Sequence, residues 1–179
     1  MLDAALAELG EHGFAELSFE RIASRAGVHK TTVYRRWPSR GDLLLDALRE
    51  RSRETVPIPD TGSLRSDLVT VLTAIAANLG TSQVQAFLRA TIAEGGSHPE
   101  LERARTAYWR ERFDMVGEIV RRAVARGELP PGADPDLVIE SAVAPLYLRT
   151  LITGEEISDP FLARIADLVI AGVGAIPTR

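Results

Sequence analysis

The 179-residue chain contains no cysteine, which excludes disulfide bonds, thiolate catalysis and cysteine–zinc sites. It has only three histidines, and these are too scattered along the chain to predict a metal site. Its longest uninterrupted apolar stretch, residues 168–177, is about half of what a membrane span needs. Acidic residues occupy the N-terminal positions where a secretory signal would be basic and then apolar. We therefore expect a cytoplasmic protein with no cofactor, no metal and no membrane contact.

Motifs typical of enzymes are also missing. The chain has no phosphate-cradling glycine loop, no G-x-S-x-G elbow and no H-E-x-x-H pair. The acidic residues Glu155, Glu156 and Asp159 form a cluster, but they flank Ser158, the expected cap of the last helix. Acidic groups at that position favour the helix dipole. The sequence is therefore predicted not to be an enzyme.

The basic residues are concentrated in one short segment. Residues 18–40 carry six basic side chains against Glu20 alone, whereas the whole chain has a formal net charge of −4. A basic island in an acidic protein indicates an anionic partner, and nucleic acid is the first candidate. The alternative is an ordinary solvated charged surface.

Apolar residues recur with a helical period throughout the chain, and no segment alternates as a strand would. Glycine and proline separate the predicted helices, which span residues 2–11, 19–25, 29–37, 39–55, 63–79, 82–94, 99–126, 135–153 and 158–176. Residues 56–62 form the only strong linker. We expect an all-α protein of about nine helices. Its N-terminal domain covers residues 1–48, with the fourth helix continuing to about residue 55 as a connector, and its C-terminal domain covers residues 56–179.

Residues 18–37 have the pattern of a helix-turn-helix, in which two short helices are joined by a turn containing glycine. Gly27 permits the tight turn, and the apolar Ile22, Val28 and Val33 are expected to hold the two helices together. In this motif the second helix enters the major groove of DNA with its N-terminal residues toward the base edges. Those residues are His29, Lys30, Thr31 and Thr32.

With this motif in place, residues 2–48 resemble the DNA-binding domain of the tetracycline-repressor (TetR) family. The family pattern has a Thr/Ser–apolar–Tyr run in the second helix of the motif, then an aromatic residue, then a basic residue that opens the next helix. The matching segments are Leu2-Asp3-Ala4-Ala5-Leu6, Glu11-His12-Gly13-Phe14, Leu17-Ser18-Phe19-Glu20-Arg21-Ile22-Ala23, Ala26-Gly27-Val28, Thr32-Val33-Tyr34-Arg35-Arg36-Trp37-Pro38-Ser39-Arg40 and Leu43-Leu44.

The resemblance implies DNA contacts to phosphates, to base edges and to the backbone near the start of the first helix of the motif. It places Lys30 and Thr31 toward the bases and Thr32, Tyr34, Arg36 and Arg40 on phosphates. The full set of expected contact residues is Ser18, Phe19, His29, Lys30, Thr31, Thr32, Tyr34, Arg35, Arg36 and Arg40.

For Tyr34, Trp37 and Arg25, structural roles are also considered. The Tyr34 ring can pack in the core while its hydroxyl stays free for DNA. Trp37 is expected to pack in the core, and Arg25 to be solvated. Two features depart from the family pattern: no basic arm precedes the first helix in this sequence, and Glu20 stands where some relatives carry a basic residue that reads bases.

The resemblance also implies that the C-terminal helices bind a small effector. The candidate pocket residues are large or polar side chains on otherwise apolar faces, and the alternative for each is an ordinary place in the core. They are Phe87, Thr91, Tyr108, Trp109, Arg112, Phe113 and Tyr147. Arg149 interrupts an apolar face, where it could meet an anionic effector or form an ion pair with an acid of its own chain or of a partner subunit.

Dimerisation is expected through the last two helices, with an interface that includes Leu146, Phe161, Ile165, Leu168, Val169 and Gly172. The resemblance thus implies a homodimeric regulator, by family default a repressor, that binds a palindromic double-stranded operator and is released by a largely apolar effector. Activation is the alternative mode of action. A second class, a dimeric ligand-binding protein that has lost DNA binding, is disfavoured by the basic island. The sequence names neither the effector nor the operator.

Overall fold

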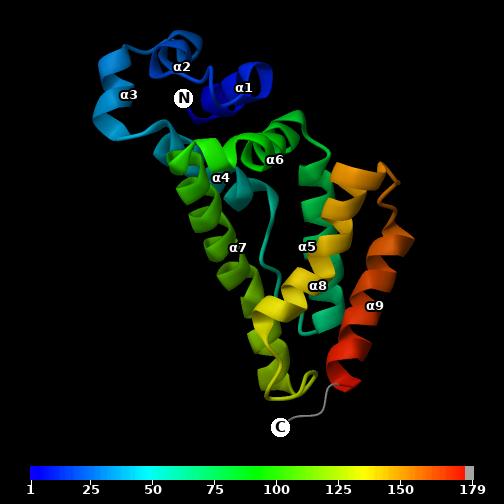
Figure 1. Ribbon diagram of the computed structural model, residues 1–179. Coiled ribbons are helices and arrows are strands. Elements are labelled where there is room, and N and C mark those ends of the chain that lie inside the picture. Colours follow the sequence, from blue (N-terminus) through cyan, green and yellow to red (C-terminus); the bar gives the residue numbers. More distant parts are fainter. Residues whose placement is uncertain (176–179) are drawn as a thin grey trace. The chain divides into compact units, whose positions relative to one another are not determined.

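The computed structural model describes residues 1–175, and these form nine α-helices without a β-strand (Figure 1). A 3₁₀ turn (Gly95–Ser97) precedes α7, and a π-helical turn (Arg149–Thr153) extends α8. The all-α prediction is confirmed. The helices are α1 (Leu2–His12), α2 (Phe19–Ala26), α3 (Lys30–Arg36), α4 (Arg40–Thr55), α5 (Leu64–Leu79), α6 (Ser82–Glu94), α7 (Pro99–Arg126), α8 (Pro135–Leu148) and α9 (Asp159–Ala175).

Local polar signals set the helix ends close to where the sequence predicts them. The Ser18 hydroxyl accepts a hydrogen bond from the Arg21 N–H at 3.3 Å and caps α2. The predicted helix 135–153 is α-helical only as far as Leu148. It then widens into the π-helical turn, which the Gly154 N–H closes by donating to the Arg149 carbonyl at 2.8 Å. The predicted end of the last helix, residue 176, lies outside the described residues.

The chain divides into two compact units, and the first comprises residues 1–54 and 80–109. Within it α1 packs against both α2 and α6, and α2 packs against α3 (Figure 1). Buried apolar side chains from α1, α2, α4 and α6 form its core, among them Leu6, Ile22, Leu44 and Phe87. The candidate helix-turn-helix therefore rests on a core that includes residues far along the chain.

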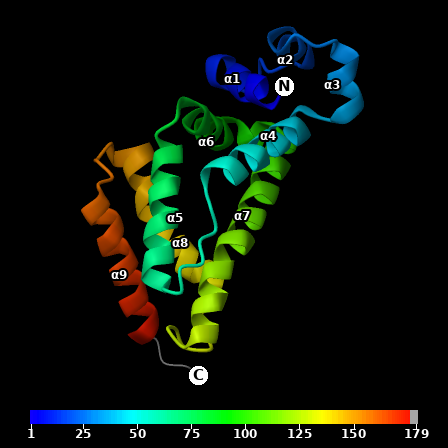
Figure 2. The same ribbon diagram turned by 180° about the vertical axis from the view of Figure 1, so that it is seen from behind.

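The second unit comprises residues 55–79 and the chain from residue 110 onward. Its helices α5, α8 and α9 lie side by side and contact one another pairwise (Figure 2). The core between them is apolar, with Leu68, Leu72, Ile139 and Leu146 almost completely buried. At the surface of this unit the Arg65 guanidinium spans α5 and α9 to reach the Asp167 carboxylate at 2.6 Å.

Within the first unit, Gly41 on α4 lies against the backbone of Glu100 at the start of α7. A Cβ atom at position 41 would lie 2.4 Å from the Glu100 carbonyl oxygen, which is shorter than any van der Waals contact. We expect Gly41→Ala to destabilise the protein by roughly 1–3 kcal/mol, because two backbones must separate to admit the methyl group. Urea unfolding followed by circular dichroism measures the change.

Gly10 provides a matched control for this substitution, since it is also a helical glycine of the same unit. A Cβ atom at position 10 would lie 3.6 Å from the Ala86 Cβ, which is an ordinary contact. Gly10→Ala is expected to stabilise the protein by roughly 0.5–1 kcal/mol, because alanine loses less conformational freedom on entering a helix. Equal effects of the two substitutions would show that the approach of α4 to residue 100 is not tight.

Candidate nucleic-acid interface

The turn between α2 and α3 is built as the sequence predicts. Gly27 caps α2 with φ +65° and ψ 30°, a left-handed conformation that L side chains rarely adopt. The Val28 N–H donates to the Ala23 carbonyl at 3.0 Å and closes the turn. Ile22 and Val33 are completely buried. The orientation of α3 on α2 is therefore fixed by packing and by one glycine.

This packing leaves the outer side of α3 open to solvent. His29, Lys30, Thr31, Tyr34, Arg35 and Arg36 are exposed, and Thr32 is half-buried. The His29 Nδ1 lies 2.9 Å from the Thr31 hydroxyl oxygen and 3.5 Å from the Thr31 backbone N–H, so the imidazole caps α3. Ser18 and Phe19, the other predicted contacts, stand at the start of α2, where Ser18 is occupied as a cap and Phe19 is buried.

Tyr34 combines the two roles expected of it only in part. Its ring packs edge-on against Phe19, with ring centroids 4.9 Å apart, and the residue is still 52% exposed. Its hydroxyl is not free, because it donates a hydrogen bond of 2.8 Å to the Glu20 carboxylate. That bond raises the pKa of Tyr34 and lowers the pKa of Glu20. DNA that uses the Tyr34 hydroxyl must therefore replace Glu20 as its partner.

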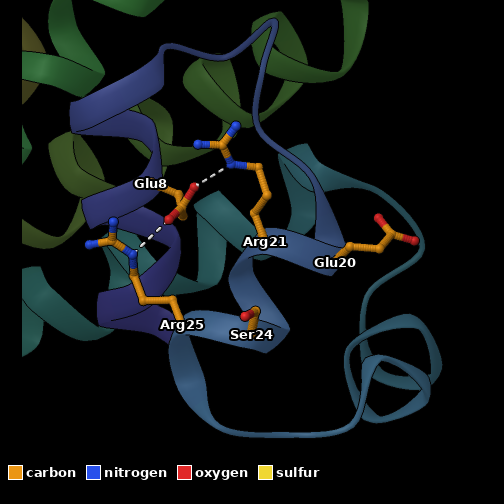
Figure 3. Close-up of a pocket in the computed structure, with 5 residues that line it drawn as sticks. All are labelled: Glu8, Glu20, Arg21, Ser24 and Arg25. Atoms are coloured by element: carbon orange, nitrogen blue, oxygen red, sulfur yellow. Dashed lines mark hydrogen bonds and ion pairs between the residues drawn. The ribbon is translucent and has the colours of Figure 1, made fainter.

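Beside α2, the Glu8 carboxylate of α1 lies between two arginines of the basic island and lines a shallow surface pocket with them (Figure 3). Glu8 is buried, and it accepts hydrogen bonds from Arg21 Nε at 2.9 Å and from Arg25 Nε at 2.6 Å. Arg25 also forms an ion pair with Glu11. Arg25 is exposed, as expected of a solvated side chain, but it is also tied to α1 by these ion pairs. The sequence could not reveal this network, because its partners lie on different helices.

Arg40 has a similar internal role at the start of α4. Its guanidinium donates to the Phe14 and Leu17 carbonyl oxygens at 3.1 and 2.8 Å, and it contacts the Glu100 carboxylate at 2.7 Å. It also lies over the Phe14 ring. These bonds tie the loop after α1 to the starts of α4 and α7. A phosphate contact by Arg40 would require it to leave some of these partners.

Three basic residues of the island remain available to an anionic partner. Lys30, Arg35 and Arg36 are exposed, and none of them forms an ion pair within the part of the chain that the structure describes. Arg36 also lies over the ring of Trp37, which is buried as predicted and donates a hydrogen bond to Asp46 at 2.9 Å. The positive surface that the fold presents is thus about half of what the sequence suggests.

One group of side chains has the composition of a metal site, namely Glu8, Glu11 and His12, whose donor atoms lie within 4.8 Å of one another. The two carboxylates are already bound by Arg21 and Arg25, which neutralise their charge. A divalent cation would have to displace two guanidinium groups. The group therefore does not fit a metal, and it serves to join α1 to α2.

The predicted effector-pocket residues fall into two groups. In the first unit, Tyr108 packs edge-on against Phe87 and Trp109, and its hydroxyl lies 2.7 Å from the Ser52 hydroxyl. Thr91, in the same unit, donates to the Leu88 carbonyl at 2.9 Å. Arg112, Phe113 and Tyr147 belong to the second unit, where Arg112 is buried and the other two are half-buried. The pocket assignment stays a prediction.

The predicted dimer residues also differ in exposure. Leu146, Ile165 and Val169 are buried in the core of their own chain, Phe161 is half-buried, and Leu168 and Gly172 are exposed. Two further apolar side chains, Leu148 and Ile152, are 50% and 76% exposed. The ion-pair alternative for Arg149 is confirmed, since Arg149 lies 3.1 Å from the Glu155 carboxylate and over the Phe161 ring.

None of the helices within residues 1–175 is both long and apolar enough to cross a membrane.

Comparisons with known proteins identify the family to which this chain is similar. The model for bacterial regulatory proteins of the tetR family matches residues 1–47, and the model for the tetracyclin repressor-like C-terminal domain matches residues 58–169. The HTH-type transcriptional regulator AqdR of Rhodococcus erythropolis is 32% identical over 172 residues, which cover 96% of this chain and 83% of AqdR. The HTH-type transcriptional regulator YdeS of Bacillus subtilis is 31% identical over 176 residues, covering 98% and 88%.

The fold agrees with the sequence comparison. The crystal structure of the TetR family transcription regulator SCO0332 matches with a TM-score of 0.76 and 30% identity over 98% of this chain and 96% of its own. The similar proteins are transcriptional regulators, not enzymes, which confirms the expectation for this chain. With its helix-turn-helix in place, the chain belongs to the TetR family of bacterial transcriptional regulators and is a DNA-binding regulator.

Proposed function

We propose that the protein is a homodimeric repressor that binds a palindromic operator in the cytoplasm through two copies of α3. The observation that carries this proposal is the rigid presentation of exposed residues on α3, which is held on α2 by the buried Ile22 and Val33 and by the turn at Gly27. Lys30 and Thr31 are proposed to meet base edges, whereas Thr32, Tyr34 and Arg36 contact phosphates. The half-sites lie about 34 Å apart, one turn of DNA, so that both helices enter the same side of the duplex.

Residues 1–48 are proposed to form the DNA-binding domain and residues 56–179 the effector-binding and dimerisation domain. The DNA-binding transcriptional repressor TetR of Mycobacteroides abscessus is 29% identical over 95% of this chain, which supports repression. The regulator FadR of Bacillus subtilis, similar in fold at 18% identity, was crystallised with stearoyl-CoA. We infer that a small effector favours a conformation of this protein in which the two α3 helices no longer match the operator spacing.

The dimer surface is proposed to centre on exposed apolar residues of the second unit. Leu148 at the end of α8 and Ile152 in its π-helical extension are exposed, and Leu168 on α9 is 73% exposed. Three large apolar side chains that are exposed to water favour burial against a partner. A second copy of the chain would cover them in a symmetric interface.

Selection of bound fragments from sheared genomic DNA of the source bacterium tests the proposal. We expect a palindrome to be enriched. Lys30→Ala should then weaken operator binding by about 1–3 kcal/mol, roughly five- to 150-fold, and relax the preference at one base pair of each half-site, because Lys30 is placed on a base edge. Fluorescence anisotropy on the selected fragment measures both the affinity and the base preference.

Arg103→Ala provides the control, because Arg103 is an exposed arginine of α7 outside the basic island. Its operator affinity is expected to match that of the natural protein. Unchanged affinity in both Lys30→Ala and Tyr34→Phe would show that α3 is not the recognition helix. The absence of any enriched fragment, with the protein refolded free of bound small molecules, would favour a ligand-binding protein without a DNA target.

A further inference from the structure

Arg112 on α7 is an arginine buried without a counter-charge. The residue is only 8% exposed, and its Nη1 atom is buried without a hydrogen-bond partner. No carboxylate of the described chain forms an ion pair with it. The guanidinium group of an arginine stays charged in proteins. A buried charge of this kind requires an anion.

The surrounding unit does not supply that anion. Along α7 the positions four and seven residues after Arg112 are Val116 and Ile119, which are both buried and apolar. The buried acid of the same unit, Asp67, accepts hydrogen bonds from the Thr61 N–H at 2.8 Å and from its hydroxyl at 2.7 Å, and it lies 3.8 Å from Arg126. Its ion-pair partner is therefore Arg126, while its Oδ2 atom, like Arg112 Nη1, is buried without a hydrogen-bond partner.

The other acids on this part of α7 are also committed. Asp114 and Glu118 both pair with Arg121, at 3.5 and 2.9 Å. The arginines of the second unit that do have acidic partners lie nearer the surface than Arg112. They are Arg65, Arg121, Arg122, Arg126 and Arg149. Arg112 thus differs from these arginines in being buried and in having no acidic partner within the described residues.

We propose that Arg112 binds the acidic group of the effector, so that the effector is an apolar molecule carrying one carboxylate, sulfonate or phosphate. A guanidinium matches such groups with two parallel hydrogen bonds, and the apolar side chains beside it suit the rest of the molecule. Identifying this ligand with the effector rests on the proposed function. The unpaired charge makes the empty protein less stable than it could be, as is common at binding sites.

Two fluorescent probes of nearly the same shape test this proposal. Anilinonaphthalene sulfonate carries an acidic group, and N-phenyl-1-naphthylamine is the same apolar body without it. Protein unfolded in guanidinium and refolded is free of carried-over ligands. We expect Arg112→Met to weaken sulfonate binding by about tenfold or more and to leave the binding of the neutral probe within about twofold, because one charge-assisted pair is lost.

Arg110→Met is the matched control, since Arg110 is an exposed arginine two residues away on the same helix. It should change neither probe. The melting temperature of ligand-free Arg112→Met is expected to equal or exceed that of the natural protein, and the sulfonate should no longer raise it. If Arg112→Met does not fold, Arg112→Lys keeps the charge but loses the paired geometry and should weaken only the sulfonate.

Several results would overturn the proposal. Equal loss of both probes in Arg112→Met would assign Arg112 to packing, and failure of the natural protein to bind the sulfonate would exclude the site. A shift from dimer to monomer in Arg112→Met, with sulfonate binding intact, would identify a carboxylate of a partner subunit as the missing anion. Operator binding by refolded Arg112→Met tests the proposed repressor function separately from the anion site. This binding is expected to persist whether or not Arg112 binds an anion.

Discussion

Operator affinity is expected to fall by roughly two orders of magnitude when the salt concentration rises from about 50 to about 200 mM. Each phosphate that a protein neutralises on B-DNA contributes about −0.9 to the slope of the logarithm of affinity against the logarithm of salt concentration. Each subunit presents three unpaired cations in the basic island, Lys30, Arg35 and Arg36. Because Lys30 is proposed to meet a base edge, Arg35 and Arg36 remain for phosphates. A dimer therefore brings four cations to phosphates, and the expected slope is about −4.

The number of basic residues in the sequence of the island would predict a much steeper dependence of operator affinity on salt concentration. With all six basic residues of each subunit on phosphates, the slope would approach about −11. The structure excludes three of them from the count, because Arg21 and Arg25 are paired with Glu8, and Arg40 with Glu100. Fluorescence anisotropy at four or more salt concentrations distinguishes the two slopes. A slope near the steeper value would mean that these arginines exchange their carboxylates for phosphates on DNA.

Two variants check that the slope counts these particular charges. Arg35→Gln removes one exposed cation from each subunit and is expected to reduce the slope by about 2. Arg103→Gln removes an exposed arginine outside the island and should leave it unchanged. A smaller slope in both variants would show that the whole surface, and not α3, contributes to the attraction for DNA.

The parts of this fold that depend on local chemistry could be predicted from the sequence. The cap at Ser18, the left-handed turn at Gly27 and the buried Ile22 and Val33 follow from short-range rules, and each lies where those rules place it. Interactions across the fold could not be predicted in the same way. Arg40 and Glu100 are 60 residues apart, and a charge pattern does not reveal which acid a folded arginine will reach.

The apolar pattern has a related limit in the second unit. A stripe such as Ile165, Leu168 and Val169 has the same spacing whether it faces its own core or a partner, because helical periodicity reports only that a face is apolar. The structure separates these roles, since Ile165 and Val169 are buried within the chain and Leu168 is not. Likewise, only the fold shows that Arg112 is buried and unpaired while Arg149 has an acid beside it.

Glu8→Gln is expected to destabilise the protein by roughly 2–3 kcal/mol at neutral pH. Removing one partner of a buried ion pair costs about 3–5 kcal/mol, and the partial exposure of Arg21 and Arg25 reduces that figure. The glutamine keeps the shape of the side chain, but its amide nitrogen would face a guanidinium donor. Urea unfolding at pH 7, followed by circular dichroism, measures the loss.

The loss should also depend on pH in a defined direction. Burial alone would raise the pKa of Glu8, but the hydrogen bonds from Arg25 and Arg21, together with their charges, outweigh burial and leave the pKa lowered. A carboxyl whose pKa is lower in the folded than in the unfolded state stabilises the fold fully above the unfolded pKa, about 4.3, and loses this contribution as the pH falls through the folded value. The difference between natural protein and Glu8→Gln is therefore largest at pH 7 and shrinks in acid.

Glu16→Gln is the control, because Glu16 is an exposed acid of the loop after α1. It is expected to change the stability by less than about 0.5 kcal/mol, as surface substitutions do. If Glu8→Gln were equally destabilising at pH 7 and at pH 3, the carboxylate charge would not be the cause, and the loss would come from the amide nitrogen placed against the guanidinium donors. A loss confined to the higher pH would instead show that the negative charge of Glu8 holds Arg21 and Arg25. Arginines held in this way are not available to DNA phosphates, and the expected salt dependence rests on the same point.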